Sequence, residues 1–108
     1  MARIKPGAWL AAALLAAGAP APAADLAAAR AKAAQCFVCH GADGLAKTPD
    51  APNLAGQNAA YLVKALKDYR SGKRENEVMS MMAKPLSDQD IALVASYFSS
   101  IAITVKAP

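Results

Sequence analysis

The chain has 108 residues, of which 56% are hydrophobic and 19% charged, and its formal net charge at pH 7 is +4. This length suits one small domain, and the mixed charge lacks the clustered basic stretch that a nucleic-acid partner would require. With two Cys and one His, the chain cannot by itself supply the four ligands, mostly Cys and His, of a structural zinc site.

Residues 1–23 have the layout of a secretory signal peptide. Basic residues come first, an apolar stretch follows, and the small residues Ala21 and Ala23 frame a cleavage site. The apolar stretch is short for a membrane span, so an uncleaved anchor is the less favoured alternative. We expect cleavage near Ala23, which leaves an exported domain of residues 24–108 with ten basic and eight acidic residues and no membrane span.

The first predicted helix, residues 26–37, is rich in Ala, a strong helix former, and Asp25 is a candidate for its N-cap. The end of this helix carries Cys36. Together with Cys39 and His40 it completes C-x-x-C-H, the signature of covalent c-type haem attachment. Two thiols at this spacing can reach the two vinyl groups of one porphyrin, and His40 follows where it can bind the iron. A disulfide or a redox dithiol is the alternative, but no parallel-strand pattern supports a thioredoxin-like dithiol.

A long loop and a second helix follow the motif. Residues 41–57 contain several Gly and Pro residues, which predict turns, and an irregular segment of this length in a small domain is usually functional. Wrapping one edge of a haem would be such a function. Residues 59–71 predict a helix, with Asn58 as its N-cap and Gly72 as its stop.

Three methionines, Met79, Met81 and Met82, lie in a segment without helical periodicity, which we interpret as a loop. His40 is the only His, so the sixth position of the iron is either open or filled by Met or Lys. Thioether sulfur is a common ligand opposite His in c-type cytochromes. Since Met also fills irregular gaps in cores, we interpret one of the three as the ligand and the other two as packing residues.

The third predicted helix begins at Ser87, where Asp90 three residues later makes nearly a capping box. Ile91 and Phe98 belong to its apolar stripe. The tail from Ala102 has nothing to pair with, and we expect it to fray.

These features together resemble a small bacterial class I cytochrome c, similar to cytochrome c553 and to one half of a dihaem cytochrome c4. The resemblance covers nearly all of residues 24–108. The matching stretches are residues 36–41, 52–57, 61–62, 69–72, 79–90 and 97–98. The resemblance implies an all-α class I cytochrome c fold, in which three main helices and long loops surround one covalent haem c. Ala29 stands where the family often has Gly, and its methyl group can still allow the first and last helices to cross closely.

The resemblance also implies roles for single residues. Met79 matches the sixth ligand, with Met82 as the second choice, so the iron would be held by His40 and Met79. The carbonyl of Pro52 matches the acceptor of a hydrogen bond from the His40 ring, a contact that makes the ligand more basic. Arg74 sits where a propionate partner is often found, and a solvated surface position is the equal alternative.

The resemblance further implies a periplasmic electron carrier that exchanges single electrons with transient partners, such as oxidases, reductases or dehydrogenases. Two protein ligands leave the iron no free site for a substrate, so we expect no enzymatic activity. The haem edge near Cys36 and Cys39 would face the partners, and a monomer is favoured. One alternative is a fixed haem subunit of a periplasmic dehydrogenase or sulfur-oxidising complex. Another is an enzyme with an open sixth position, which ranks lower because no second His is available.

Overall fold

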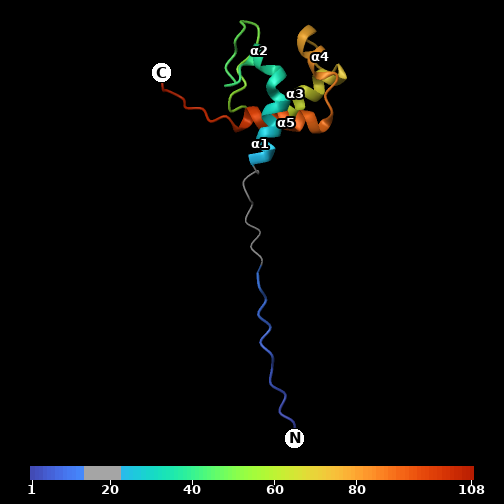
Figure 1. Cartoon of the computed structure of the whole chain (residues 1–108), viewed down its shortest axis with the longest axis vertical. Helices are drawn as coiled ribbons and strands as arrows, with labels where there is room; N and C mark the ends of the chain where they lie inside the picture. The colour runs from blue at the N-terminus through green and yellow to red at the C-terminus, as the bar shows by residue number, and fades with distance from the viewer. Residues whose placement is uncertain (14–22) are drawn as a thin grey trace.

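The structure is a computed structural model that describes residues 1–13 and 23–108. Its elements are α1 (Ala23–Ala33), a 3-10 turn (Ala34–Cys36), α2 (Phe37–His40), α3 (Ala59–Ser71), α4 (Glu77–Ala83) and α5 (Asp88–Ser100). The described residues contain no strand, so the predicted all-α class is confirmed (Figure 1). None of the helices in this part of the chain has both the length and the apolar character needed to cross a bilayer.

The boundary of the predicted signal peptide stays a prediction. Two of the three residues that form the expected cleavage motif, 21 and 22, lie outside the described residues. The sequence indicated Asp25 as the N-cap of the first helix. Helix α1 instead begins at Ala23, so Asp25 lies in its first turn.

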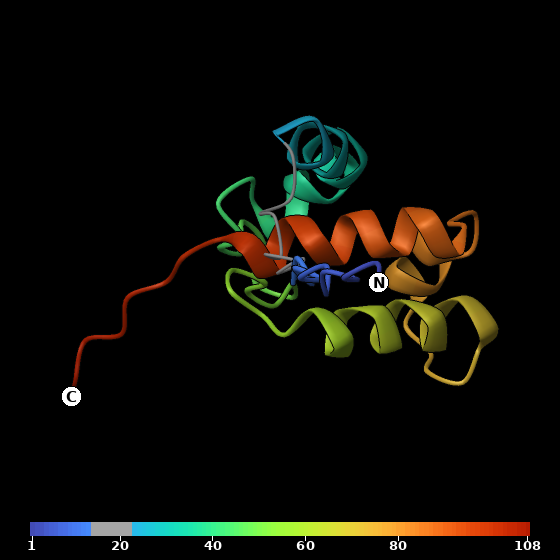
Figure 2. The same cartoon turned by 90° about the horizontal axis from the view of Figure 1, so that it is seen from below.

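Helix α5 lies between α1 and α3, as Figure 2 shows. Small residues let α1 approach α5 closely, since Ala29 and Ala33 have no exposed surface. The Tyr97 hydroxyl donates a hydrogen bond to the Ala42 carbonyl and accepts one from Arg30 Nη1 at 2.9 Å. This contact ties α1, α5 and the loop after α2 into one unit.

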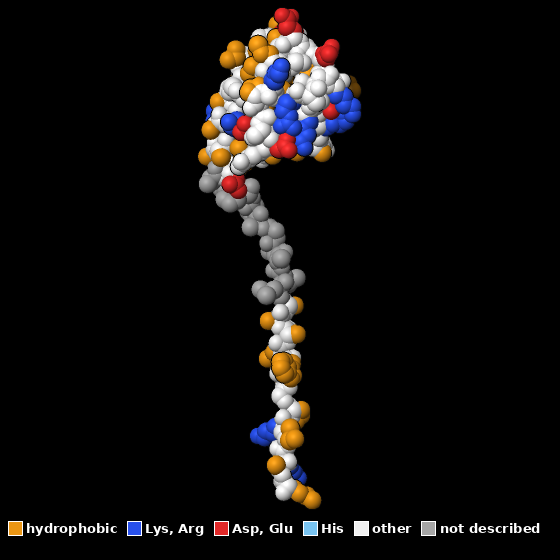
Figure 3. Space-filling model, turned by 90° about the vertical axis from the view of Figure 1, so that its right-hand side faces the viewer, with side chains coloured by type: hydrophobic (Ala, Val, Ile, Leu, Met, Phe, Trp, Pro, Cys, Tyr) orange, Lys and Arg blue, Asp and Glu red, His pale blue; other side chains and the backbone are white. Residues whose placement is uncertain are grey.

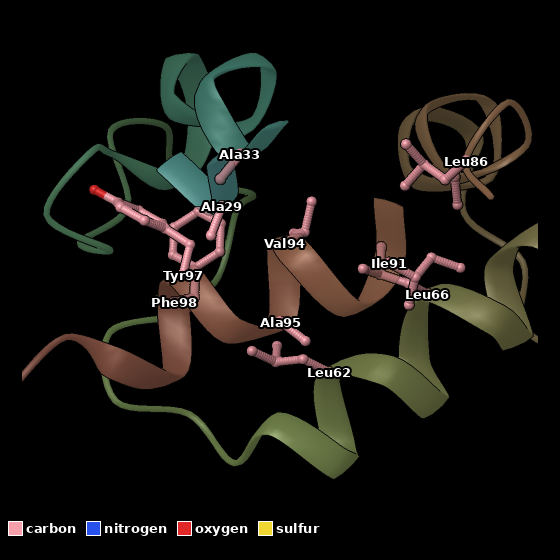
Figure 4. Close-up of a cluster of buried hydrophobic side chains, with 11 residues drawn as sticks. Ala29, Ala33, Leu62, Leu66, Leu86, Ile91, Val94, Ala95, Tyr97 and Phe98 are labelled. Atoms are coloured by element: carbon pink, nitrogen blue, oxygen red, sulfur yellow. The ribbon is translucent and has the colours of Figure 1, made fainter. Parts of the chain in front are cut away.

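The hydrophobic core surrounds α5, with α1 packed on one side of it and α3 on the other (Figure 4). Leu62 and Leu66 of α3 lie next to Ala95 and Ile91, while Phe98 lies on the α1 side of α5. Ile91 and Phe98 are the two largest fully buried side chains in the described residues. The core has eleven buried hydrophobic residues, and four of them are Ala. Because Ala buries little apolar area, this core is small for its chain length.

Helix α3 begins and ends where the sequence predicts, and α5 begins where it predicts. Asn58 caps α3 by accepting a hydrogen bond from the Tyr61 amide at 3.1 Å, and Gly72 ends it with a φ of 84°. Ser87 and Asp90 form a reciprocal capping box at the start of α5. Both predictions are confirmed, because each rests on side chains that act within one turn of the helix end.

The prediction of one continuous helix over residues 26–37 is wrong. The α-helix ends at Ala33, a 3-10 turn follows, and a single turn of α-helix then carries the motif to His40. A 3-10 turn winds more tightly than an α-helix, so it rotates the side chains that come after it. The Ala-rich composition could not reveal this change, because Ala favours helix without marking where its winding changes.

The interpretation of the methionine segment as a loop is also wrong. Met79, Met81 and Met82 lie in α4, which Asn76 caps by accepting hydrogen bonds from the amides of Val78 and Met79 at 3.1 and 2.9 Å. A helix of seven residues has too few turns to show a periodic apolar pattern. The cap at Asn76 was the local signal that could have found it.

The loop over residues 41–57 is irregular, as predicted, and it packs against itself at Gly44. Gly44 has a φ of 73°, and a Cβ there would lie 2.6 to 2.8 Å from three atoms of Ala55. Its carbonyl also accepts hydrogen bonds from the amides of Leu54 and Ala55. The loop therefore folds back only if residue 44 has no side chain.

We expect Gly44→Ala to destabilise the domain more than Gly72→Ala does. Both positions have positive φ, a conformation that costs an L-residue about 1–2 kcal/mol, but a Cβ at Gly72 would meet nothing within 4 Å. The clash with Ala55 is therefore an extra cost that only the first variant carries. Thermal unfolding followed by circular dichroism measures the difference, and equal midpoints for the two variants would contradict the expectation.

Candidate functional site

A largely apolar cavity opens between α3, α5 and the segments that carry the predicted site residues. Cys36, His40, Pro52 and Met79 all line it. Cys39 lines an adjoining cavity, which His40, Pro52 and Met79 also border. The fold thus brings together all five residues that the sequence singled out.

His40 is held rigidly in the wall of the cavity. Only 7% of its surface is exposed, and it is the single buried polar or charged residue in the described part of the chain. Its Nδ1 donates a hydrogen bond to the Pro52 carbonyl at 2.8 Å, and its ring lies 6.5 Å from the ring of Phe98. Because Nδ1 carries the proton, Nε2 of the neutral ring keeps a lone pair for a metal.

Cys36 and Cys39 are free thiols on either side of the start of α2, and both are half-buried. Burial raises the pKa of the Cys36 thiol to about 11, so it stays protonated near neutral pH. Redox-active dithiols instead need a lowered pKa, since the thiolate is the reactive form. The surroundings of Cys36 therefore disfavour the alternative of a thioredoxin-like dithiol.

The three methionines of α4 have different surroundings. Met79 is half-buried and lines the cavity with His40, whereas 67% of Met81 is exposed. Met82 is half-buried but does not line the cavity. Of the three methionines, therefore, Met79 is the one that lines the cavity with His40.

These residues fit a covalently attached haem. The donors are an imidazole and a thioether, which are common axial ligands of haem iron, and two thiols stand at the attachment spacing. The hydroxyl oxygen of Thr48 gives independent support, since among the described residues it is the one buried side-chain N or O atom without a hydrogen-bond partner. Thr48 lines the adjoining cavity beside His40 and Met79, where a bound polar group could satisfy it.

Several residues of the cavity were not predicted from the sequence as site residues. Val94 and Phe98 of α5 and Leu66 of α3 line it, although their periodicity identified them only as core residues. Arg74, which the resemblance implied as a propionate partner, also lines the cavity, with its guanidinium 4.7 Å from the centre of the Tyr69 ring. Periodicity shows that a face is buried and does not show whether protein or cofactor covers it.

Comparison with known proteins identifies relatives over most of the chain. The sequence profile of the family described as cytochrome c matches residues 24–102. Cytochrome c-554(548) of Halomonas halodenitrificans is 47% identical over 79 residues, which are 70% of this chain and 95% of that protein. Cytochrome c4 of Pseudomonas aeruginosa is 48% identical over 81 residues, which are 75% of this chain and 40% of that protein.

A third relative is described by its role. The thiosulfate dehydrogenase electron acceptor of Thiomonas intermedia is 43% identical over 79 residues, which are 72% of this chain and 36% of that protein. The chain therefore matches less than half the length of this relative and of the cytochrome c4, and nearly the full length of the cytochrome c-554(548).

Proposed function

The chain belongs to the cytochrome c family and has the class I fold, and we propose that it is an electron-transfer protein that carries one haem c in the periplasm. In this proposal Cys36 and Cys39 hold the haem through thioethers, and His40 and Met79 are the two axial ligands. The observation that carries it is the buried His40, hydrogen-bonded to Pro52 in an apolar cavity that Met79 also lines.

The residues of the chain prepare the site for electron transfer. A bound haem supplies a one-electron couple at its iron. The hydrogen bond from His40 to Pro52 fixes the ring and increases the basicity of the opposite nitrogen. Apolar side chains such as Leu66 and Phe98 keep water away from the cavity. A rigid, water-poor wall changes little between the two oxidation states, which favours rapid exchange of single electrons over substrate chemistry.

The partners are proposed to be redox proteins that bind transiently, since interfaces of this kind are usually small. The names of relatives favour one partner class in particular, because two of them are described as thiosulfate dehydrogenase electron acceptors. A second candidate role is therefore that of an acceptor subunit that stays bound to a periplasmic dehydrogenase. Co-purification with a larger protein at high salt would distinguish this role from that of a free carrier.

The test of the proposed function is an optical spectrum of the exported protein in both oxidation states, with a pyridine haemochrome assay. We expect sharp bands in the reduced protein, a haemochrome typical of two thioether bonds, and one haem per chain. Protein that remains free of haem in a host competent for cytochrome c maturation would overturn the proposal and return Cys36 and Cys39 to a disulfide or dithiol role.

A further inference from the structure

The basic residues of the domain are concentrated on α3 and on the turn that follows it. Lys64, Lys67 and Arg70 recur every third residue along α3 and so share one side of the helix. Lys73 and Arg74 come directly after the helix. These five residues, which we call the α3 basic face, are half of the ten basic residues at positions 24–108.

Two carboxylates form ion pairs with this face. Asp68 pairs with Lys64, and Asp88 pairs with Arg70 at 2.6 Å. The pKa of each carboxyl is lowered, chiefly by the hydrogen bond from its partner, so both stay ionised at neutral pH. The other three cations of the face have no carboxylate within ion-pair distance among the described residues.

The charge of the domain is therefore uneven. Glu75, Glu77 and Lys84 line a cavity together with Arg70 beside this face. With these residues and the two paired carboxylates, this side of the domain has six cations and four carboxylates, a net charge of +2. Positions 24–108 as a whole also have +2, so the remainder is neutral. Figure 3 shows the side of the domain where α3, α4 and the start of α5 lie, and Lys and Arg side chains gather there with a few Asp and Glu side chains among them. Such an asymmetry orients an approaching charged partner.

The α3 basic face reaches the wall of the cavity. The Arg74 guanidinium lies over the ring of Tyr69 and donates a hydrogen bond to the Tyr61 hydroxyl at 3.4 Å. All three residues line the cavity, and 49% of Tyr61 is exposed. A protein bound on this face would stand next to the proposed haem.

The edge near the attachment cysteines offers no comparable charge. Val38 between the two cysteines is 79% exposed. Lys47, whose amide donates to the Cys39 carbonyl, forms an ion pair with Asp43 at 3.2 Å. Electrostatic steering toward this edge would therefore be weak, in contrast to the expectation that partners meet the protein there.

We propose that the α3 basic face is the docking surface for the redox partners, and that these partners present an acidic surface to it. This proposal rests on the proposed function. It adds which surface of the protein the redox partner contacts and the acidic character of the partner's surface. Complementary charge mainly raises the association rate and is screened by salt, so both effects can be measured without knowing the natural partner.

The experiment uses the haem-loaded protein and two small oxidants of opposite charge, hexacyanoferrate(III) and tris(phenanthroline)cobalt(III). Four variants change the net charge equally: Lys67→Glu and Lys73→Glu on the α3 basic face, Lys47→Glu near the cysteines, and Lys106→Glu in the tail. At low salt we expect the first two to slow oxidation by the anionic reagent by about threefold or more and to speed oxidation by the cationic one. The differences should shrink at about 0.5 M salt.

The pattern among the four variants decides the outcome. A larger effect for Lys47→Glu would place the encounter at the cysteine edge, and equal effects for all four would mean that only the net charge matters. Either result, obtained with normal haem spectra, would contradict docking at the α3 basic face and would leave the proposed function unaffected. Absence of haem from the wild-type protein would overturn both.

A second measurement tests the acidic partner directly. Poly-L-glutamate is added to the reduced protein, and the amide resonances are followed by nuclear magnetic resonance. Shifts confined to residues 64–74 that disappear at high salt are the expected result. Shifts centred on Val38 and Cys39, or no salt-sensitive shifts, would contradict the proposal.

Discussion

Replacing Met79 by Ala is expected to abolish the weak far-red band that arises from sulfur bound to ferric haem iron, and to let the reduced protein bind carbon monoxide. Met79 is the methionine of α4 that lines the cavity with His40, and Ala has no donor atom to replace its sulfur. The reduction potential should fall as well, because Met ligation raises it. Absorption spectra of both oxidation states and a potentiometric titration measure these changes.

The matched controls come from the same helix. Met82→Ala and Met81→Ala each remove one methionine and should keep the far-red band, since neither side chain lines the cavity. Loss of the band in Met82→Ala, with its retention in Met79→Ala, would transfer the ligand role to Met82. Rapid carbon monoxide binding by the wild-type protein would instead favour an open sixth position and the enzymatic alternative.

The double variant Cys36→Ser, Cys39→Ser is expected to lose most of its helical structure. Without thioethers the haem is not held, and the eleven buried hydrophobic residues, four of them Ala, are then a small core for a domain of about 85 residues. Helix α3 packs on α5 around the cavity, so an unfilled cavity would leave apolar walls exposed to water. Far-ultraviolet circular dichroism at 25 °C measures the helical content.

Val38→Ser is the control for this change. It places a Ser in the same short helix, where the side chain is 79% exposed, and keeps both thiols. We expect it to bind haem and to keep the wild-type spectrum. A native helical spectrum for the double Cys variant would show that the polypeptide folds without its cofactor, and it would remove this argument for the haem as part of the core.

The sequence by itself determined those features that depend on short-range signals. C-x-x-C-H predicts haem attachment because the reacting groups are set by residue type and spacing alone. Helices α3 and α5 were located because their caps, at Asn58 and Ser87, act within a single turn. The family follows from the same stretches, and the profile match over residues 24–102 confirms it.

Only the tertiary structure decided which surfaces meet. The change of winding at Ala34–Cys36 and the choice of Met79 as the methionine at the cavity depend on packing among segments distant in the chain. The same holds for the pairing of Arg70 with Asp88, eighteen residues apart. Local patterns record which residues are apolar or charged. Distances between remote residues arise only when the chain folds, and they decide which of these residues share a cavity or a face.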